Sequence, residues 1–119
     1  MISNGIDIIE IKRFDKLKNN DTFMKSVFNT NELEYIKKSN NSSKTIAGLY
    51  ASKEAFLKSL KMGINNYSLL DIEIIHDNNR CPSIILHGQI KKTYSNIKNM
   101  SLSISHDGDY AVSIVTLII

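Results

Sequence analysis

The hydrophobic and polar positions of the chain follow two periods, one typical of strands and the other of helices. Five segments are rich in β-branched residues or alternate apolar with polar positions, as strands do: 5–11, 69–76, 83–87, 101–106 and 110–118. Four segments have apolar residues three or four positions apart, as helices do: 14–28 (short and broken), 31–39, 44–62 and 88–98. Because strands and helices are partly segregated along the chain, the pattern predicts an α+β fold with an antiparallel sheet packed on one long central helix.

Residues at the ends of these segments indicate where the elements begin, end and turn. Asn31 can cap the helix that follows it, with Glu34 reaching back from three residues later, and Gly63 can end the long helix. The polar stretch 77–82 and the Asp-Gly-Asp sequence at 107–109 each join two strand segments. The chain is therefore expected to contain two hairpins.

The composition of the chain limits the classes of protein to which it can belong. A chain of 119 residues is near the usual size of one domain, and no repeat or linker divides residues 1–119. The formal net charge of +3 is small and its basic residues are dispersed, unlike those of a nucleic-acid-binding surface. The single cysteine, Cys81, suits a reducing compartment, and the acids inside the first apolar run argue against a signal peptide. No apolar stretch is long enough to cross a bilayer, so we expect a cytoplasmic protein that binds neither nucleic acid nor a membrane.

The long helix carries two charged residues one turn apart, Glu54 and Lys58. Their face of the helix also holds Ala47, Ala51 and Tyr50. A Glu four residues before a Lys is most often a surface ion pair, worth about 0.3–0.5 kcal/mol. The alternative is that the alanines leave room for a ligand, with Glu54 as an oxygen ligand for a metal and Lys58 as a point charge for a phosphate.

Three further residues are candidate functional residues, but each is a weak candidate when it is taken alone. Asp7 lies in the middle of the first strand, which is apolar enough to be buried, and its carboxylate either faces water or serves as a metal ligand on a rigid element. A histidine at a turn, such as His106, commonly forms a structural hydrogen bond at that turn. Arg13 follows the first strand and is by itself a weak signal. The residues by themselves therefore indicate metal-assisted phosphate chemistry and nothing narrower.

Three segments narrow the interpretation when they are taken in order. GIDIIEIKRF (5–14) stands near the N-terminus, AGLYASKEAFLKSLKMGI (47–64) in the middle and SISHDGDYAVSIV (103–115) near the C-terminus. In this order and at this chain length they resemble the holo-acyl-carrier-protein synthases, the small members of the 4'-phosphopantetheinyl transferase superfamily. The resemblance extends over the whole chain, and its most specific part is the KEAFLKSL helix.

The resemblance implies a reaction and the residues that perform it. The family transfers the 4'-phosphopantetheine group of coenzyme A to a serine of apo-acyl carrier protein, for fatty acid biosynthesis, and releases adenosine 3',5'-bisphosphate. Mg2+ is the usual cofactor, and the two acids that bind it fall on Asp7 and Glu54. Lys58 falls on the helix lysine of the family, and Arg13 on an arginine that faces the carrier protein.

The resemblance also implies contacts with coenzyme A at six positions: Lys44, Lys58, Lys61, Gly63, Pro82 and His106. The chain departs from the family pattern on the nucleotide side. Leu49 stands where many members have an arginine, Lys61 replaces a glycine, and Arg80 replaces a glycine two residues before Pro82. Members are typically homotrimers with active sites between protomers, so either Lys61 or a neighbouring subunit could supply the missing charge.

Two alternatives stay open at this point. The same transfer could serve a polyketide or peptide-synthetase carrier domain, although the short chain favours the fatty-acid carrier. A protein of a different class would be a non-catalytic module that binds an acidic partner through Arg13 and nearby lysines. Such a module would need neither Asp7 nor Glu54 and would not consume coenzyme A.

Overall fold

The computed structural model describes residues 1–61 and 67–119, and its elements form the predicted α+β fold. The strands are β1 (Ile2–Glu10), β2 (Ile72–His76), β3 (Pro82–Leu86), β4 (Asn99–Asp107) and β5 (Tyr110–Ile118). The helices are α1 (Phe14–Leu17), α2 (Asp21–Val27), α3 (Thr30–Lys38), α4 (Ser43–Ser59) and α5 (Gly88–Thr93), with 3-10 turns η1 (Ile11–Arg13) and η2 (Leu69–Asp71). Both predicted hairpins and the broken helix at the N-terminus are confirmed.

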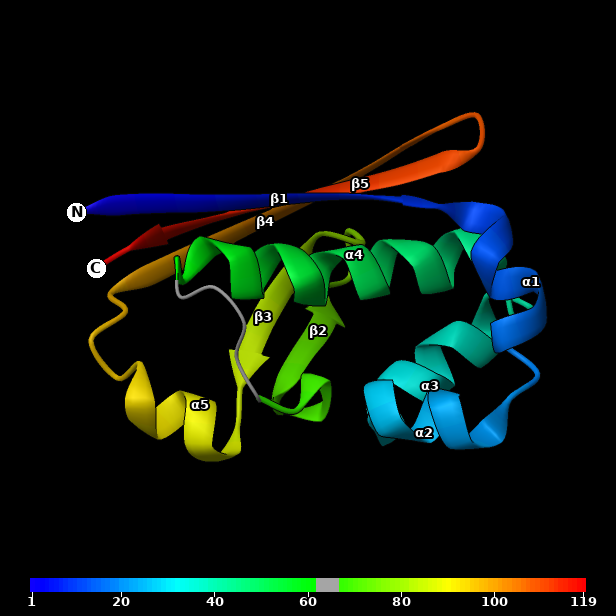
Figure 1. Cartoon of the computed structure of the whole chain (residues 1–119), viewed down its shortest axis with the longest axis horizontal. Coiled ribbons are helices and arrows are strands. Elements are labelled where there is room, and N and C mark those ends of the chain that lie inside the picture. Colours follow the sequence, from blue (N-terminus) through cyan, green and yellow to red (C-terminus); the bar gives the residue numbers. More distant parts are fainter. Residues whose placement is uncertain (62–66) are drawn as a thin grey trace.

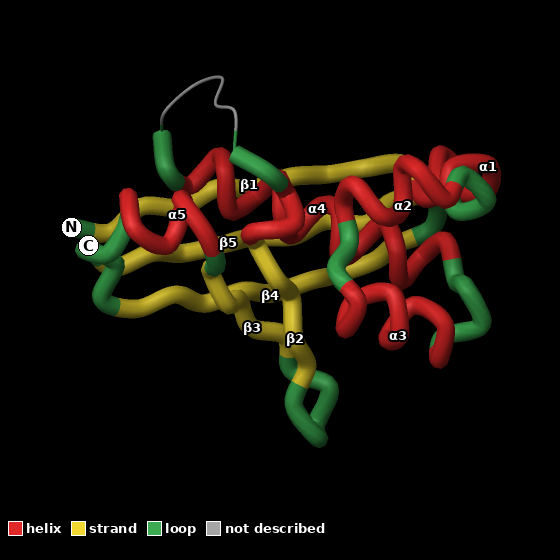
Figure 2. The backbone as a smooth tube through the Cα atoms, turned by 90° about the horizontal axis from the view of Figure 1, so that it is seen from below, coloured by secondary structure: helices red, strands yellow, loops and turns green. Residues whose placement is uncertain are grey.

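The long helix α4 lies between two layers (Figure 1). One layer is an antiparallel sheet with the strand order β1-β5-β4, and the other contains the β2-β3 hairpin with α2, α3 and α5. Figure 2 shows this second layer from below, in front of the long strands. Because the first and last strands pair, the chain ends meet, and the Met1 ammonium group donates a 2.8 Å hydrogen bond to the Ile119 carbonyl.

The helix approaches the three-stranded sheet closely because small residues fill the contact. Ala47, Ala51 and Ala55 are fully buried. A Cβ atom on Gly5 would collide with the backbone of Ala55 and Ser59, so this strand position requires glycine. The prediction that Ala47 and Ala51 leave room for a ligand was wrong, because both side chains are fully buried within the fold.

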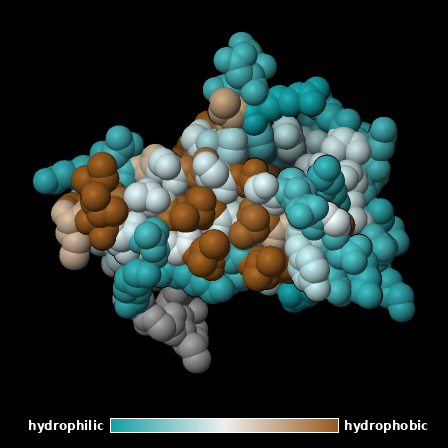
Figure 3. All heavy atoms as spheres, turned by 90° about the horizontal axis from the view of Figure 1, so that it is seen from above, coloured by the Kyte–Doolittle hydropathy of each residue, from teal (hydrophilic) through white to brown (hydrophobic). Residues whose placement is uncertain are grey.

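The burial of side chains on the two faces of β1 differs from the prediction. Gly5, Asp7 and Ile9 point toward α4, whereas Ile6 and Ile8 point away and are 59% and 65% exposed. The prediction of a buried strand therefore holds for one face only. Figure 3, which views the sheet from outside, shows the resulting apolar surface over the middle of the molecule. We call it the outer sheet face; its large exposed residues are Ile2, Ile6, Ile8, Tyr110, Ile114 and Ile118.

Helix α3 begins two residues earlier than predicted. Its cap is Asn29, whose side chain accepts a hydrogen bond from the Glu32 backbone, while the Glu32 carboxylate accepts one from the Asn29 backbone. The predicted cap, Asn31, lies inside the helix. The earlier start is favoured because the Glu32 carboxylate is needed in the core, where the Lys53 ammonium group lies 2.6 Å away.

Helix α4 starts at the Ser42 cap and ends at Ser59, so it is shorter at its C-terminal end than the predicted span. Lys61 follows in the left-handed region, with φ of +58°, a conformation that favours glycine. The predicted stop at Gly63 lies outside the described residues. Helix α5 is also shorter than predicted, because it ends at Thr93. Within the part of the chain that the structure describes, no helix has the length and apolar character needed to cross a membrane.

Candidate active site

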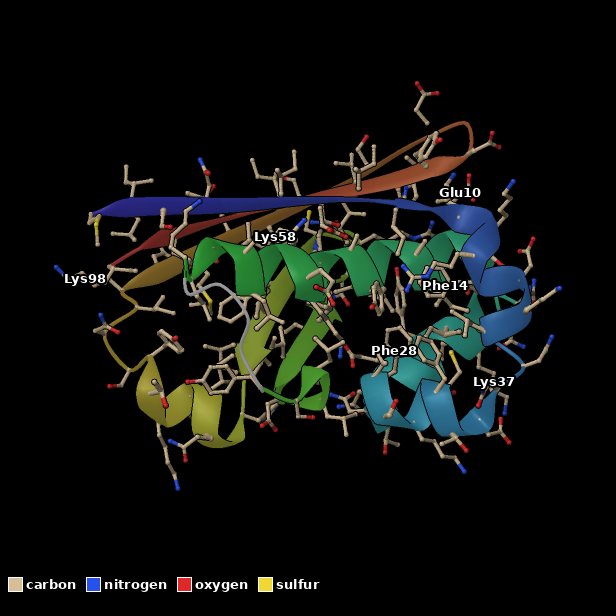
Figure 4. All side chains as sticks on the ribbon, viewed as in Figure 1. Glu10, Phe14, Phe28, Lys37, Lys58 and Lys98 are labelled. Atoms are coloured by element: carbon tan, nitrogen blue, oxygen red, sulfur yellow. The ribbon has the colours of Figure 1, made fainter. Side chains whose placement is uncertain are left out.

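Asp7 and Lys58 meet between β1 and α4. The Lys58 ammonium nitrogen lies 2.9 Å from an Asp7 carboxylate oxygen, and the Asp7 side chain is only 14% exposed. Figure 4 labels Lys58 on α4, which lies beneath β1 in that view. The interpretation in which Asp7 faces water was therefore wrong. So was the simple surface pair on the helix, since no ion pair in the described residues joins Lys58 to Glu54.

Glu54 lies one helical turn before Lys58 and one turn after Tyr50 on α4. The Tyr50 ring centre lies 5.5 Å from the Arg13 guanidinium carbon, and its hydroxyl interacts electrostatically with the Glu54 carboxylate. Burial, and after it the negative charge of Glu54, raise the pKa of Tyr50 above its usual range. Tyr50 thus interacts electrostatically with both Arg13, which is exposed, and the carboxylate on the helix.

The strand register places Asp7 beside the same part of α4. Gly5 contacts the helix at Ala55 and Ser59, and β1 runs antiparallel to α4 in Figure 1. Two residues further along the strand, a distance of about 7 Å, Asp7 reaches the turn that carries Glu54. Asp7, Glu54 and Lys58 therefore form one group at the β1 edge of the sheet. Two carboxylates and an amine are suited to binding a divalent cation and a phosphate.

This group is not a closed metal site. Among the described residues, no three His, Cys, Asp or Glu side chains converge closely enough to hold a metal by themselves. Two carboxylates are nevertheless a usual protein contribution to Mg2+ binding, because this ion keeps several waters and takes phosphate oxygens as further ligands. The donor set of Asp7 and Glu54 fits that pattern.

His106 belongs to a second region, at the β4 edge of the sheet. Its Nε2 lies 3.2 Å from the Lys44 carbonyl, and its ring packs on Gly48, where a Cβ atom would come within 3.2 Å of Nε2. Burial lowers the pKa of His106, so the imidazole is neutral at pH 7. Beside it is a cavity of about 210 Å³, which we call the edge pocket; it is lined by Tyr35, Thr45, Gly48, Leu49, His76, Arg80, Pro82, Ile104 and His106.

The two regions lie on opposite sides of α4. At 3.6 residues per turn, Leu49 and Thr45 are rotated by about 140° and 180° from Glu54 around the helix axis. The sheet topology agrees, because Asp7 is on the edge strand β1 and His106 is on the other edge strand, β4. The described residues of one chain therefore do not bring the carboxylates and the edge pocket together.

The other residues predicted to contact coenzyme A lie in different parts of the molecule. Pro82 lines the edge pocket with His106, whereas Lys44 contributes its carbonyl there. Lys61 lies beyond the opposite end of α4, and Gly63 lies outside the described residues. Sequence reasoning missed Tyr50 as a partner of Glu54, although its spacing of four residues on a helix is a signal for contact.

Comparison with known proteins agrees with the sequence resemblance. Residues 3–115 match the family model described as the 4'-phosphopantetheinyl transferase superfamily. The holo-[acyl-carrier-protein] synthase of Caldicellulosiruptor saccharolyticus is 47% identical over 116 residues, which cover 95% of this chain and 94% of that protein. The chain belongs to the holo-[acyl-carrier-protein] synthases of this superfamily.

Other holo-[acyl-carrier-protein] synthases are similar over most of their length. That of Finegoldia magna is 39% identical over 115 residues, covering 97% of this chain and 94% of its own. The crystal structure of the Helicobacter pylori synthase in complex with coenzyme A superposes with a TM-score of 0.84 at 36% identity. It covers 99% of this chain and 100% of the H. pylori chain, so the fold of the family is shared throughout.

Proposed function

We propose that this chain transfers the 4'-phosphopantetheine group of coenzyme A to a serine of apo-acyl carrier protein, and so serves fatty acid biosynthesis. The observation that carries the proposal is the contact of Lys58 with Asp7 beside Glu54, at one edge of the sheet. The relatives bear the name of this activity, and the H. pylori relative was crystallised with coenzyme A.

The transfer exchanges one bond to phosphorus for another. The serine oxygen bonds to the phosphorus that carries the pantetheine arm, and the bond from that phosphorus to the bridging oxygen breaks. Adenosine 3',5'-bisphosphate leaves with new negative charge on its 5'-phosphate. The Lys58 side chain is 56% exposed, so it can bind this phosphate and offset its charge. Glu54 and a water beside it are the two candidates for the base that takes the serine proton.

Asp7 and Glu54 are the residues that would hold Mg2+. When bound, the ion supplies positive charge against the pyrophosphate oxygens of coenzyme A. Asp7 is held on a strand and Glu54 on a long helix, so both oxygens are presented from rigid elements. Tyr50 lies one helical turn before Glu54 and interacts with its carboxylate electrostatically.

Further contacts follow from the family. Arg13 is exposed beside Tyr50 and is the proposed contact for the acidic carrier protein. Lys44, Lys61, Gly63, Pro82 and His106 are the proposed contacts for coenzyme A besides Lys58. A cytoplasmic location stays a prediction.

We further propose that the working form is a homotrimer with its sites between protomers. Two observations support this assembly. The catalytic residues and the edge pocket lie at opposite edges of the sheet, so the edge pocket of one protomer can complete the site of the next. The outer sheet face presents a cluster of exposed isoleucines, which is a typical feature of a protein–protein interface.

The test is a reconstitution. Incubation of an apo-acyl carrier protein with this protein, coenzyme A and Mg2+ is expected to add one phosphopantetheine to the carrier, as measured by intact-protein mass spectrometry. EDTA is expected to abolish the addition, and excess Mg2+ to restore it. Fatty-acid, polyketide and peptide-synthetase carriers assayed side by side determine the carrier preference. A folded preparation that modifies none of these carriers would overturn the proposal and favour a non-catalytic module.

A further inference from the structure

The β2–β3 turn presents a single arginine, Arg80, in a fixed conformation. An Asp77 carboxylate oxygen accepts hydrogen bonds from the backbones of Asn79 (2.8 Å) and Cys81 (2.9 Å). The Arg80 backbone donates to the Asp77 carbonyl at 2.9 Å. Arg80 has a φ of +63°, a left-handed conformation that costs a residue with a side chain about 1 kcal/mol or more relative to glycine. An arginine kept at a position suited to glycine suggests a use for its side chain.

The side chain of Arg80 borders the edge pocket. It lines this cavity together with Thr45 of α4 and His106 of β4, and it also lines two adjoining hollows bounded by α3. Tyr35 of α3 stacks on His76 of β2 with ring centres 4.0 Å apart and planes 3° from parallel. Both stacked rings line the edge pocket, so α3 and β2 bound it on one side.

The positive charge of Arg80 is available to a ligand in the edge pocket. In the described residues, its guanidinium group makes no ion pair or hydrogen bond. Burial lowers the pKa of both His76 and His106, so these imidazoles can donate or accept hydrogen bonds at pH 7 but bring little charge. Leu49, at the position where many family members have an arginine, contributes only apolar surface to the pocket. Arg80 is therefore the permanent cation among the residues that line the edge pocket.

We propose that Arg80 binds the 3'-phosphate of coenzyme A in the edge pocket, and that it replaces from the β2–β3 turn the cation that α4 lacks at Leu49. A guanidinium group matches a phosphate monoester well, because its planar fork can donate two parallel hydrogen bonds. The same contact holds the product, adenosine 3',5'-bisphosphate. This inference rests on the proposed function, and it specifies which part of the substrate the edge pocket binds.

The test compares coenzyme A with 3'-dephospho-coenzyme A, which lacks only this phosphate. Calorimetric titration is expected to show that the unmodified protein binds coenzyme A more tightly, by about ten- to a hundredfold. Arg80→Gly is expected to abolish the preference while leaving the affinity for dephospho-coenzyme A unchanged. The variant should keep its fold, since glycine relieves the positive φ. Lys91→Ala, which removes an exposed cation from α5, is the matched control and should keep the full preference.

A second variant tests the replacement directly. Leu49→Arg in the Arg80→Gly background is expected to restore the preference for coenzyme A, because it returns a cation to the pocket from the helix. Arg80→Lys should give an intermediate preference, since it keeps the charge but loses the two parallel hydrogen bonds. An Arg80→Gly protein that still prefers coenzyme A as strongly as the unmodified one would overturn the inference.

The failure of this inference is distinguishable from the failure of the proposed function. If the unmodified protein modifies the carrier and Arg80→Gly keeps the full preference, only the assignment of Arg80 is wrong. If the unmodified protein modifies no carrier with either coenzyme, the proposed function is wrong, and with it the inference that rests on it.

Discussion

Lys58 donates a 2.9 Å hydrogen bond to Asp7, so the residue proposed to bind phosphate is held by a residue proposed to bind metal. A Mg2+ ion held by Asp7 would compete with the Lys58 ammonium group, because two cations beside one carboxylate repel each other. The ammonium group of Lys58, whose side chain is 56% exposed, would then be available to a phosphate. The ion pair of the free protein is on this interpretation a resting arrangement of the site.

Lys58→Met should separate metal binding from catalysis. Without its competitor, Asp7 is expected to bind Mg2+ more tightly in the absence of coenzyme A. The transfer rate should nevertheless fall by about 10²–10³-fold, because a positive charge is lost where negative charge develops. Calorimetric titration with Mg2+ and the carrier assay measure the two effects, with Lys91→Met as the control. Weaker or unchanged Mg2+ binding would contradict the competition.

Glu54→Gln should remove activity without removing the fold. Glutamine keeps the size and one oxygen but loses the charge that a hard cation needs, so the rate should fall by orders of magnitude and the Mg2+ concentration for half-maximal rate should rise. The pKa of Tyr50 should fall as well, because the charge of Glu54 raises it. Ultraviolet titration of the phenolate, with Tyr50→Phe to assign the signal, checks this. A near-normal rate at low Mg2+ would remove Glu54 from the metal site.

Arg13→Glu should act on the carrier protein more than on coenzyme A. Its guanidinium group is exposed beside Tyr50, so it acts mainly on the encounter with an acidic partner. The KM for the carrier is expected to rise and its dependence on salt to flatten, with little change in coenzyme A affinity. Equal losses in both affinities would show that Arg13 supports the nucleotide site or the fold.

Ile8→Glu should dissociate the proposed trimer. Ile8 is 65% exposed in the isolated chain, so a glutamate there is compatible with the fold but not with a buried interface. Analytical ultracentrifugation is expected to show monomers, and the transfer activity should fall with them. Asn96→Glu, on an exposed loop, is the control.

Mixing inactive variants tests whether the site is shared between protomers. Glu54→Gln and His106→Ala proteins, dissociated and reassembled together, should recover activity, since some sites then combine an intact edge pocket with an intact carboxylate pair. A mixture no more active than its components would place each complete site within one chain.

Lys53→Met should destabilise the fold strongly. The Lys53 ammonium group is fully buried and donates to Glu32 at 2.6 Å, to the Val27 carbonyl at 2.7 Å and to the Leu69 carbonyl at 2.9 Å. Its removal leaves the Glu32 carboxylate buried without a counter-ion, which costs about 3–5 kcal/mol. Urea denaturation measures the loss, with the exposed Lys37→Met as control. The double variant Lys53→Met/Glu32→Gln should recover part of it.

The elements of the fold were predictable because their signals are local. The Asp-Gly-Asp turn at 107–109 and the period of apolar residues in α4 depend on near neighbours in the chain, and the structure contains both elements. The cap of α3 was misplaced by two residues because its choice is not local. Glu32 is required by Lys53, 21 residues away, and no spacing within the helix shows that.

The sequence by itself determined the types of the elements and the family, and through the family the chemistry expected of Asp7, Glu54 and Lys58. Only the tertiary structure decided which face of β1 covers α4. Hydrophobicity alone would bury Ile6 and Ile8, but the helix can approach only the face that carries Gly5, and Asp7 is on that face. Tertiary structure also decided that the carboxylates and the edge pocket lie at opposite edges of the sheet, because strand order depends on pairing between distant segments.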